Sequence, residues 1–283
     1  MTASLSPYIS QFDEEFDAGK SSHYRMTIQF SLGGLSYALL DADTKTLVAL
    51  ECYQSNLLES SDDLISCLEK ALQSKGLNNL VSSSVTCIID NRFSTLVPQP
   101  LFNETEQAKY LEFGFQMPDG YTISSEPLAT LPCVNVFALP EPLKDTLQSK
   151  WRGIKVTHTA TIFANNAMQD KASTGAFIQV RNRDFDMLIK KDSKLHFFNN
   201  FRFNTKEDFA YFLLFALEQN GMEGIETPVY FTGLIRPASD IIDLCGRYVK
   251  DIRFAEDPHT LQVSKALKDV PFQYYFNHYH TLR

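Results

Sequence analysis

The sequence predicts a mixed α/β protein in which one β-β-β-α-β unit occurs twice. At 283 residues the chain is long enough for about two domains of ~150 residues each. Two segments with a helical apolar pattern, Ser60–Leu80 and Thr205–Ile225, align with each other without a gap. β-rich runs precede each of these segments, and one more follows each. The repeated order of elements therefore indicates an internal duplication.

The strands expected before each helix form a short meander. They are Tyr24–Phe30, Leu35–Asp41 and Thr46–Tyr53 in the first half, and Gly175–Arg181, Asp184–Lys190 and Leu195–Phe203 in the second. Turns separate these β-rich runs, and the second turn of each meander is short and polar. A further strand follows each helix, at Val85–Asp90 and Pro228–Gly233. Parallel pairing of that strand with the meander gives the usual right-handed crossover.

Both expected helices carry the same terminal signals. Ser60 and Thr205 are candidate N-caps, and each has an aspartate three residues later, Asp63 or Asp208, that helps to satisfy free backbone N–H groups. Matching apolar residues line one side of each helix: Leu64, Ile65, Leu68, Ala71 and Leu72, then Phe209, Ala210, Leu213, Ala216 and Leu217. A glycine suited to a left-handed C-cap closes each helix: Gly76 and Gly221.

A stretch between the two units has no counterpart in the second half. Its expected elements are a helix over Asn103–Phe113, strands at Tyr121–Pro127 and Cys133–Leu139, and a helix from Pro140 through Lys150. A strand at Ile154–His158 and a helix at Thr161–Met168 lead into the second unit. We expect a first domain over residues 1–170 with an inserted subdomain at about 103–150. A second domain with a C-terminal tail then covers 171–283.

Composition narrows the class of protein. The formal charge of −8 argues against nucleic acid as a partner, because phosphates require a basic face. Five scattered cysteines without a C-x-x-C pair fit reduced thiols of a cytoplasmic protein better than disulfides or a zinc site. The N-terminal sequence has neither a basic segment nor an apolar run, and no apolar window reaches the ~20 residues that a membrane helix needs. We therefore expect neither export nor membrane insertion.

The duplicated unit with an inserted subdomain resembles the actin-like ATPase fold, in which two ribonuclease-H-like domains face each other across a cleft. Within it, the chain is most similar to the PilM-like and FtsA-like branch, whose insert is followed by a strand and a small-residue helix. The corresponding stretch here is Val134–Met168, VNVFALPEPLKDTLQSKWRGIKVTHTATIFANNAM. The chain also resembles an uncharacterised bacterial family of this fold that is known only as a domain of unknown function.

The resemblance implies three nucleotide-binding loops, and the sequence departs from the family pattern in two of them. A first D-x-G hairpin supplies an acid for hydrated Mg²⁺; here Ser31 or Gln29 stands at the acid's place before Gly33 and Gly34. A second, glycine-rich hairpin is replaced by residues 179–184, which lack glycine. The adenosine-side loop keeps one glycine. The candidate nucleotide- or anion-binding residues are Ser31, Gly33, Gly34, Arg181, Asn182, Arg183 and Gly233.

Each candidate also has an ordinary structural interpretation. Gly33 and Gly34 suit a hairpin turn, Arg181 to Arg183 a solvated turn, and Gly233 a tight strand-to-helix turn. His278 and His280 lack an evident third ligand, and a frayed C terminus is the favoured interpretation. The aromatic tail Phe272–Tyr279 and the acidic arm Tyr8–Asp17 are either interaction segments or, preferably, packed on the parent domain. We identify no catalytic residue and no metal-ligand set.

The leading functional hypothesis is a non-catalytic or weakly nucleotide-binding scaffold of the bacterial cytoplasm. Its cleft or inserted subdomain would dock a protein or peptide partner, and no cofactor is expected. The alternative is a Mg-ATP-dependent ATPase or phosphotransferase that uses the interdomain cleft, with acids recruited from Asp41 or Asp184. A third hypothesis is a structural homo-oligomer assembled through the inserted subdomain, so the oligomeric state stays open.

Overall fold

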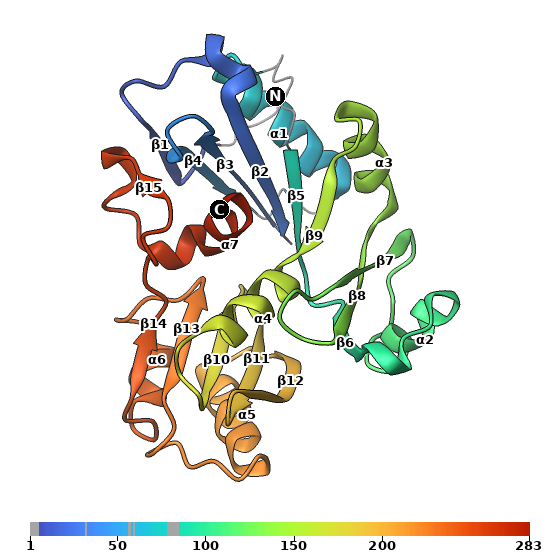
Figure 1. The fold of residues 1–283 in the computed structure, drawn as a ribbon, viewed down its shortest axis with the longest axis vertical. Coiled ribbons are helices and arrows are strands. Elements are labelled where there is room, and N and C mark those ends of the chain that lie inside the picture. Colours follow the sequence, from blue (N-terminus) through green and yellow to red (C-terminus); the bar gives the residue numbers. More distant parts are fainter. Residues whose placement is uncertain (1–5, 32, 56–57, 59, 78–84) are drawn as a thin grey trace.

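The computed structural model describes residues 6–31, 33–55, 58, 60–77 and 85–283, which form two large sheets and a small one (Figure 1). The first sheet has the order β1-β4-β3-β2-β5-β9, and β15 also pairs with β4. Its strands are β1 Ile9–Phe12, β2 Tyr24–Ser31, β3 Gly34–Asp41, β4 Thr46–Gln54, β5 Val85–Asp90, β9 Lys155–His158 and β15 Gln262–Val263. The meander β2-β3-β4 is antiparallel, and β5 pairs with β2 in parallel.

The second sheet repeats this arrangement in the order β12-β11-β10-β13-β14. Its strands are β10 Gly175–Val180, β11 Asp184–Lys191, β12 Lys194–Arg202, β13 Val229–Gly233 and β14 Ile252–Phe254. The meander β10-β11-β12 is antiparallel, and β13 pairs with β10 in parallel, as β5 pairs with β2. The predicted duplication is therefore confirmed strand by strand.

The two crossover helices are α1, Ser61–Ser74, and α5, Lys206–Gln219. Both begin with the predicted capping box, in which the N-cap side chain and the aspartate three residues later bond each other's backbone N–H groups. Both also end as predicted, with a glycine at positive φ, +70° at Gly76 and +65° at Gly221. Each helix is several residues shorter than its predicted segment, and residues 78–80 of the first segment lie outside the described residues.

The stretch without a counterpart forms the small antiparallel sheet β6-β8-β7, with β6 Ser94–Pro98, β7 Tyr121–Pro127 and β8 Cys133–Pro140. It starts at β6, before the residues expected from the sequence, because Ser94–Pro98 pairs with β8. A short helix, α2 Gln107–Glu112, packs on this sheet, and α3, Glu141–Lys150, packs against α1. The small-residue helix α4, Thr159–Gln169, then leads into the second half.

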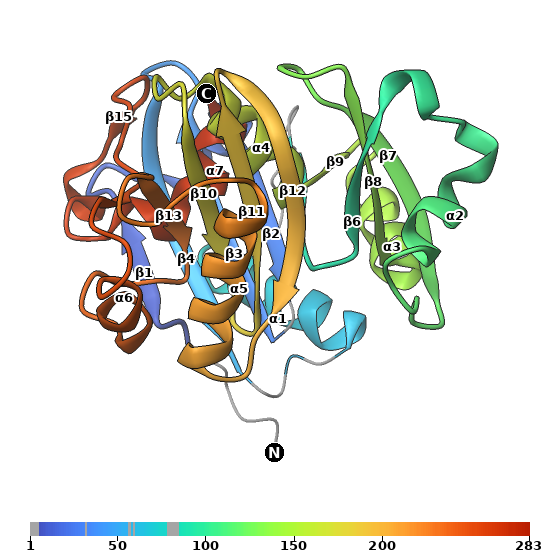
Figure 2. The ribbon, with the colours of Figure 1, turned by 90° about the horizontal axis from the view of Figure 1, so that it is seen from below.

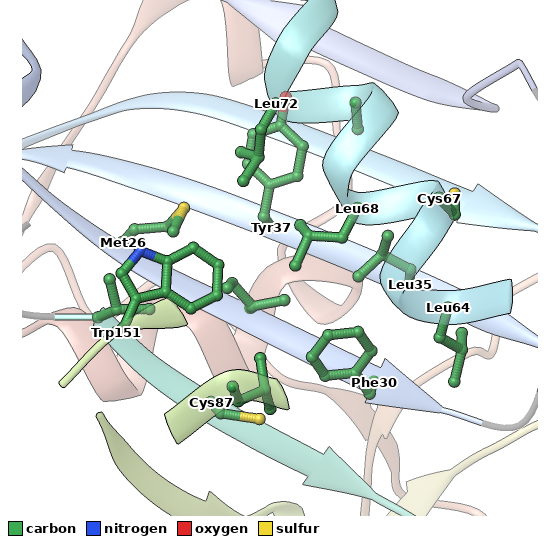
Figure 3. Packing of buried hydrophobic residues seen from close by; sticks show 14 of the residues in the cluster. Met26, Phe30, Leu35, Tyr37, Leu64, Cys67, Leu68, Leu72, Cys87 and Trp151 are labelled. Atoms are coloured by element: carbon green, nitrogen blue, oxygen red, sulfur yellow. The ribbon is translucent and has the colours of Figure 1, made fainter. Parts of the chain in front are cut away.

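Helices and sheets alternate in layers (Figures 1 and 2). One face of the first sheet packs on α1 and α3, where alternate β2 residues such as Met26 and Phe30 meet Leu68 and Leu72 of α1 (Figure 3). The other face packs on α7, Phe272–Leu282. In the second half, α5 and α6, Asp240–Cys245, cover one face of the sheet, and α4 lies on the other. Thus α4 and α7 lie between the two sheets.

The C-terminal tail completes the first half. β15 pairs with β4, and α7 packs on β2 and β3, so Tyr279 at 0% exposure is core. The interpretation that the aromatic tail packs on its own chain is confirmed, and the expected fraying around His278 and His280 is wrong. His278 is buried between Thr27 and Ser36, whose hydroxyl oxygens lie 2.8 Å from Nδ1 and 2.8 Å from Nε2 respectively.

Candidate functional site

Arg181 lies where the two halves meet. It directly follows β10, and its backbone N–H donates to the Asp184 carbonyl over 2.8 Å, which closes the hairpin into β11. Ile178 and Val180 face the core under α5, so Gln179 and Arg181 project from the opposite face. That face points toward the first half. Only 7% of Arg181 is exposed, so the solvated turn expected from the sequence is wrong for this residue.

The Arg181 guanidinium binds carboxylates from both sheets. Its Nε donates to Asp90 Oδ1 at the end of β5 over 2.6 Å, and Nη1 donates to Asp184 Oδ1 over 2.7 Å. Its Nη2 donates to Asp186, also on β11. The planar fork of arginine suits such simultaneous contacts, and each one is charge-assisted. A buried ion pair therefore connects the last residue of β5 to the residue after β10.

Further polar side chains extend this cluster into the helical layer. Thr159, the first residue of α4, donates its hydroxyl to Asp90 Oδ1 over 3.2 Å. Gln29 of β2 donates to Asp90 Oδ2 over 3.0 Å and accepts from Asn277 of α7 over 3.1 Å. We name Gln29, Asp90, Thr159, Arg181, Asp184, Asp186 and Asn277 the junction cluster. It joins both sheets to both helices between them.

Burial controls the electrostatics of the junction cluster. It raises the pKa of Asp90 and of Asp186 above that of an exposed aspartate, and the positive charge of Arg181 opposes both shifts. Burial also acts to lower the pKa of Arg181, but the carboxylates of Asp186, Asp90 and Asp184 outweigh it and hold that pKa well above its ordinary value. The guanidinium is therefore fixed as a cation, and the carboxylates depend on it.

The buried His158, at the N-cap of α4, is neutral beside this charge. Its Nδ1 accepts from the Ala160 backbone N–H over 3.1 Å, so the proton resides on Nε2, which lies 3.3 Å from Asn91 Oδ1. Burial, and then the nearby charge of Arg181, lower the pKa of His158 well below that of a free histidine. It acts as a helix cap.

The sequence-predicted residues of the first hairpin surround its turn. Ser31 and Gly34 are register partners, Gly33 has φ of +73°, and Leu32 lies outside the described residues. A Cβ on Gly34 would stand 2.7 Å from Ser31 Oγ and 3.3 Å from the Tyr53 carbonyl oxygen, so a larger residue would require the Ser31 hydroxyl to turn away. Ser31 is also the register partner of Asp90, which places the hairpin beside the junction cluster. Whether it binds an anion stays a prediction.

The remaining candidates divide into two groups. Asn182 and Arg183 are exposed at the tip of the second hairpin, as a solvated turn requires. Gly233 is the register partner of Val180 at the end of β13 and has φ of +86°. A Cβ there would stand 2.2 Å from the Val180 carbonyl oxygen, so close backbone contact requires the glycine. The ends of β2, β5, β10 and β13 thus meet around Arg181.

This donor set does not fit hydrated Mg²⁺ with a nucleotide. Asp90 and Asp186, which are buried near the hairpins, already neutralise an arginine of the same chain. The second hairpin has no glycine through which a phosphate could approach the backbone. Within the described ranges, no three histidine, cysteine or acidic side chains are grouped to hold a metal ion. The arrangement can clamp the two halves together.

Sequence reasoning overlooked most of the junction cluster. Asp90 has a recognisable signal, because it ends a buried strand at the sheet edge where open α/β folds place ligand-binding groups. Gln29 was noted from the resemblance only as standing at the place of the missing acid. Thr159 has no signal, since a polar residue at a helix start is common. Asn277 has no signal either, since the predicted packing of the aromatic tail does not say which residues it meets. Their meeting depends on how the two halves pack.

Two surface hollows in the described part of the chain lie away from this cluster. One, of about 770 Å³, is lined by the segment between β15 and α7 and by residues such as Asp257 and Tyr275. The other, of about 640 Å³, has Arg25, Lys45 and Arg283 at its edge. None of the candidate residues from the sequence lines either hollow.

Comparison with known proteins identifies the family. Residues 13–252 match the family described as "Protein of unknown function (DUF3822)". The chain belongs to this family. No curated protein sequence matches significantly. None of the helices in the described residues is long and apolar enough to cross a membrane.

Solved structures identify the fold. The chain is similar to a protein from Bacteroides thetaiotaomicron with an actin-like ATPase fold and unknown function, with a TM-score of 0.75 and 16% identity over 85% of this chain and 93% of that one. It is also similar to the PilM-PilN type IV pilus biogenesis complex, with a TM-score of 0.54 and 11% identity over 91% and 96% of the two chains. This DUF3822 protein has the actin-like ATPase fold.

Proposed function

We propose that this DUF3822 protein is a non-catalytic scaffold with an actin-like fold that works by docking a partner protein. The junction cluster carries the proposal. A buried arginine neutralises Asp90 and Asp186, so neither carboxylate is free to hold hydrated Mg²⁺. Phosphoryl transfer requires metal, carboxylate and nestled phosphates together, so this composition favours binding without catalysis.

Two further observations support a protein partner. The similar PilM structure is that of a complex with PilN, so a chain of this fold forms a protein complex there. In the inserted subdomain of the present chain, Phe113 at the end of α2 and Leu101 in the turn after β6 are 95% and 68% exposed, although large apolar side chains are usually covered. We propose that the inserted subdomain presents these side chains to the partner in the bacterial cytoplasm.

Thermal unfolding with Mg²⁺ alone and with Mg-ATP tests whether the chain binds a nucleotide. A ligand at about 100 times its dissociation constant stabilises a protein by about 2.7 kcal/mol, which a melting curve resolves. We expect Mg-ATP to leave the melting temperature unchanged relative to Mg²⁺ alone. A clear rise with Mg-ATP would instead support the ATPase or phosphotransferase alternative.

Quantitative cross-linking in the native cytoplasm tests the docking surface. We expect the wild-type chain to cross-link to one predominant protein, and Phe113→Ser to reduce that product. Lys109→Ser on α2 is the control, because it removes only an exposed charge and its surface ion pair with Glu106. Phe212→Ser on α5 is unsuitable because that ring packs on the second core. Equal cross-linking of wild-type and Phe113→Ser chains would contradict docking at the insert.

A further inference from the structure

A continuous set of aromatic rings reaches the surface on the outer side of the second half. We name Phe197 and Phe201 of β12 with Tyr211, Phe212 and Phe215 of α5 the α5 aromatic face. Ring centroids are 6.1 Å apart for Phe197 and Phe201, 5.2 Å for Phe201 and Phe212, and 5.8 Å for Tyr211 and Phe215. The outermost rings, Tyr211 and Phe215, are 61% and 44% exposed. Figure 2 shows α5 on the outside of the second sheet.

The duplication provides an internal reference for this face. In the gap-free alignment of the two crossover helices, Ser66 and Lys70 of α1 stand where α5 has Tyr211 and Phe215. Ser66 and Lys70 are exposed, and polar residues are ordinary there on a helix that meets water. The fold therefore does not require apolar side chains at Tyr211 and Phe215, because polar side chains occupy the matching positions of α1.

The first half shows a helix that packs beside the matching position, on a side of α1 that leaves Ser66 and Lys70 exposed. α3 packs against α1 and buries Leu143 and Leu147, which lie one turn apart. At the end of α3, Lys150 Nζ lies 3.0 Å from Glu69 Oε1 of α1. The second half has no inserted segment that supplies an α3. A crossover helix of this unit thus already binds an amphipathic helix with a terminal lysine, although on the side next to these positions.

Charge at the two ends of the face selects the occupant. Glu207 and Glu218 are exposed and lie on the same side of α5 as Tyr211 and Phe215, about 16 Å apart along the helix. Neither glutamate forms an ion pair within the part of the chain that the structure describes, and Lys206 pairs with Asp240 over 3.8 Å instead. If a second copy bound here around a two-fold axis, the glutamates of the two copies would face and repel each other. A partner with lysine or arginine at both ends of an apolar stripe would complement them.

We propose that the α5 aromatic face binds a basic amphipathic helix of a partner protein. The partner's apolar stripe packs on Tyr211 and Phe215, and its terminal cations pair with Glu207 and Glu218. This surface is separate from the inserted subdomain. The inference rests on the proposed function only in that the chain acts by binding proteins.

Binding of two labelled synthetic helices to the full chain tests this proposal by fluorescence anisotropy. One peptide of about 18 residues has leucines at helical spacing and lysines at both ends. The control peptide replaces the lysines with glutamates. The matched variant is Tyr211→Ser/Phe215→Lys, which introduces the residues of α1 at exposed positions and so preserves the fold. Phe113→Ser removes an exposed ring at the end of α2, in the inserted subdomain, instead.

We expect the lysine peptide to bind at least about tenfold more tightly than the glutamate peptide, and added salt to weaken it. Tyr211→Ser/Phe215→Lys should lower that affinity by about tenfold or more, and Phe113→Ser should leave it unchanged. Absence of binding, equal binding of both peptides, or loss only in Phe113→Ser would overturn the proposal. If sedimentation equilibrium shows a dimer that Tyr211→Ser/Phe215→Lys abolishes, the occupant of the face is a second copy of the chain, and the proposal of a partner helix is wrong. None of these outcomes depends on Mg-ATP, so they leave the test of the proposed function independent.

Discussion

Replacing Arg181 by methionine removes the cation that three carboxylates share. Asp90 and Asp186 are nearly inaccessible, with side chains 10% and 4% exposed, so water cannot replace the guanidinium. Removing one partner of a buried ion pair typically costs about 3–5 kcal/mol. We expect Arg181→Met to lower the free energy of unfolding by about that amount near neutral pH.

The loss of unfolding free energy caused by Arg181→Met should be smaller at acidic pH. Without Arg181, burial raises the pKa of Asp90 and Asp186 further, and the folded chain takes up a proton on at least one of them. Keeping one aspartate neutral costs about 1.36 kcal/mol for each pH unit above an unfolded pKa of ~3.9. That is about 4.9 kcal/mol at about pH 7.5 and about 2.2 at about pH 5.5. A group with a raised folded pKa stabilises the fold at low pH and loses this effect as pH rises.

Urea unfolding at both pH values measures the effect. Circular dichroism follows the whole chain, and fluorescence of Trp151, the only tryptophan, follows the first half, in whose core it is buried. Arg183→Met is the control because Arg183 is exposed on the same hairpin, and a change within about 0.5 kcal/mol is expected. Arg181→Met/Asp90→Asn/Asp186→Asn should recover much of the loss. A loss below about 1 kcal/mol, or an equal loss at both pH values, would refute the reasoning.

Three further outcomes are expected. Burial lowers the pKa of His278 to about 3, so at about pH 6 the unfolded chain binds a proton there and the folded chain does not. The stability of the wild type therefore falls as the pH drops below ~6.5. His278→Gln should lack about 1.4 kcal/mol of the stability loss that the wild type shows between about pH 7.5 and 5.5. An identical pH dependence in both chains would contradict this. Gly233→Ala should lower the free energy of unfolding in urea by about 3 kcal/mol, because Gly233 has a φ of +86° and a Cβ there would meet the Val180 carbonyl oxygen. Gly120→Ala is the control, with a φ of +73° and open space around it, and should cost about 1 kcal/mol. Equal costs would show that the contact with Val180 is relieved. Thr205→Ala should lower the melting temperature by the equivalent of about 1 kcal/mol through loss of the α5 cap, and Thr44→Ala, in an exposed turn, should have a smaller effect.

The duplication was readable from the sequence because its signals are local. Capping residues such as Ser60 and Asp63 and the apolar periodicity of α1 and α5 act within one helix, and the structure follows both. β-rich runs likewise predicted the strands, since their apolar residues must face a core whatever the topology. The resemblance to the actin-like fold rested on this order of elements, and the solved structures confirm it.

The junction cluster and the place where the tail packs were decided only by tertiary structure. Asp90 and Arg181 are far apart in sequence, and nothing local to either residue states that one neutralises the other. The dense aromatic residues of the tail predicted packing on its own chain, but only the tertiary structure decided that β15 pairs with β4 and that α7 covers the first sheet. A residue's neighbours determine its local conformation, whereas its charge partner and its burial depend on segments that meet only when the two halves fold together.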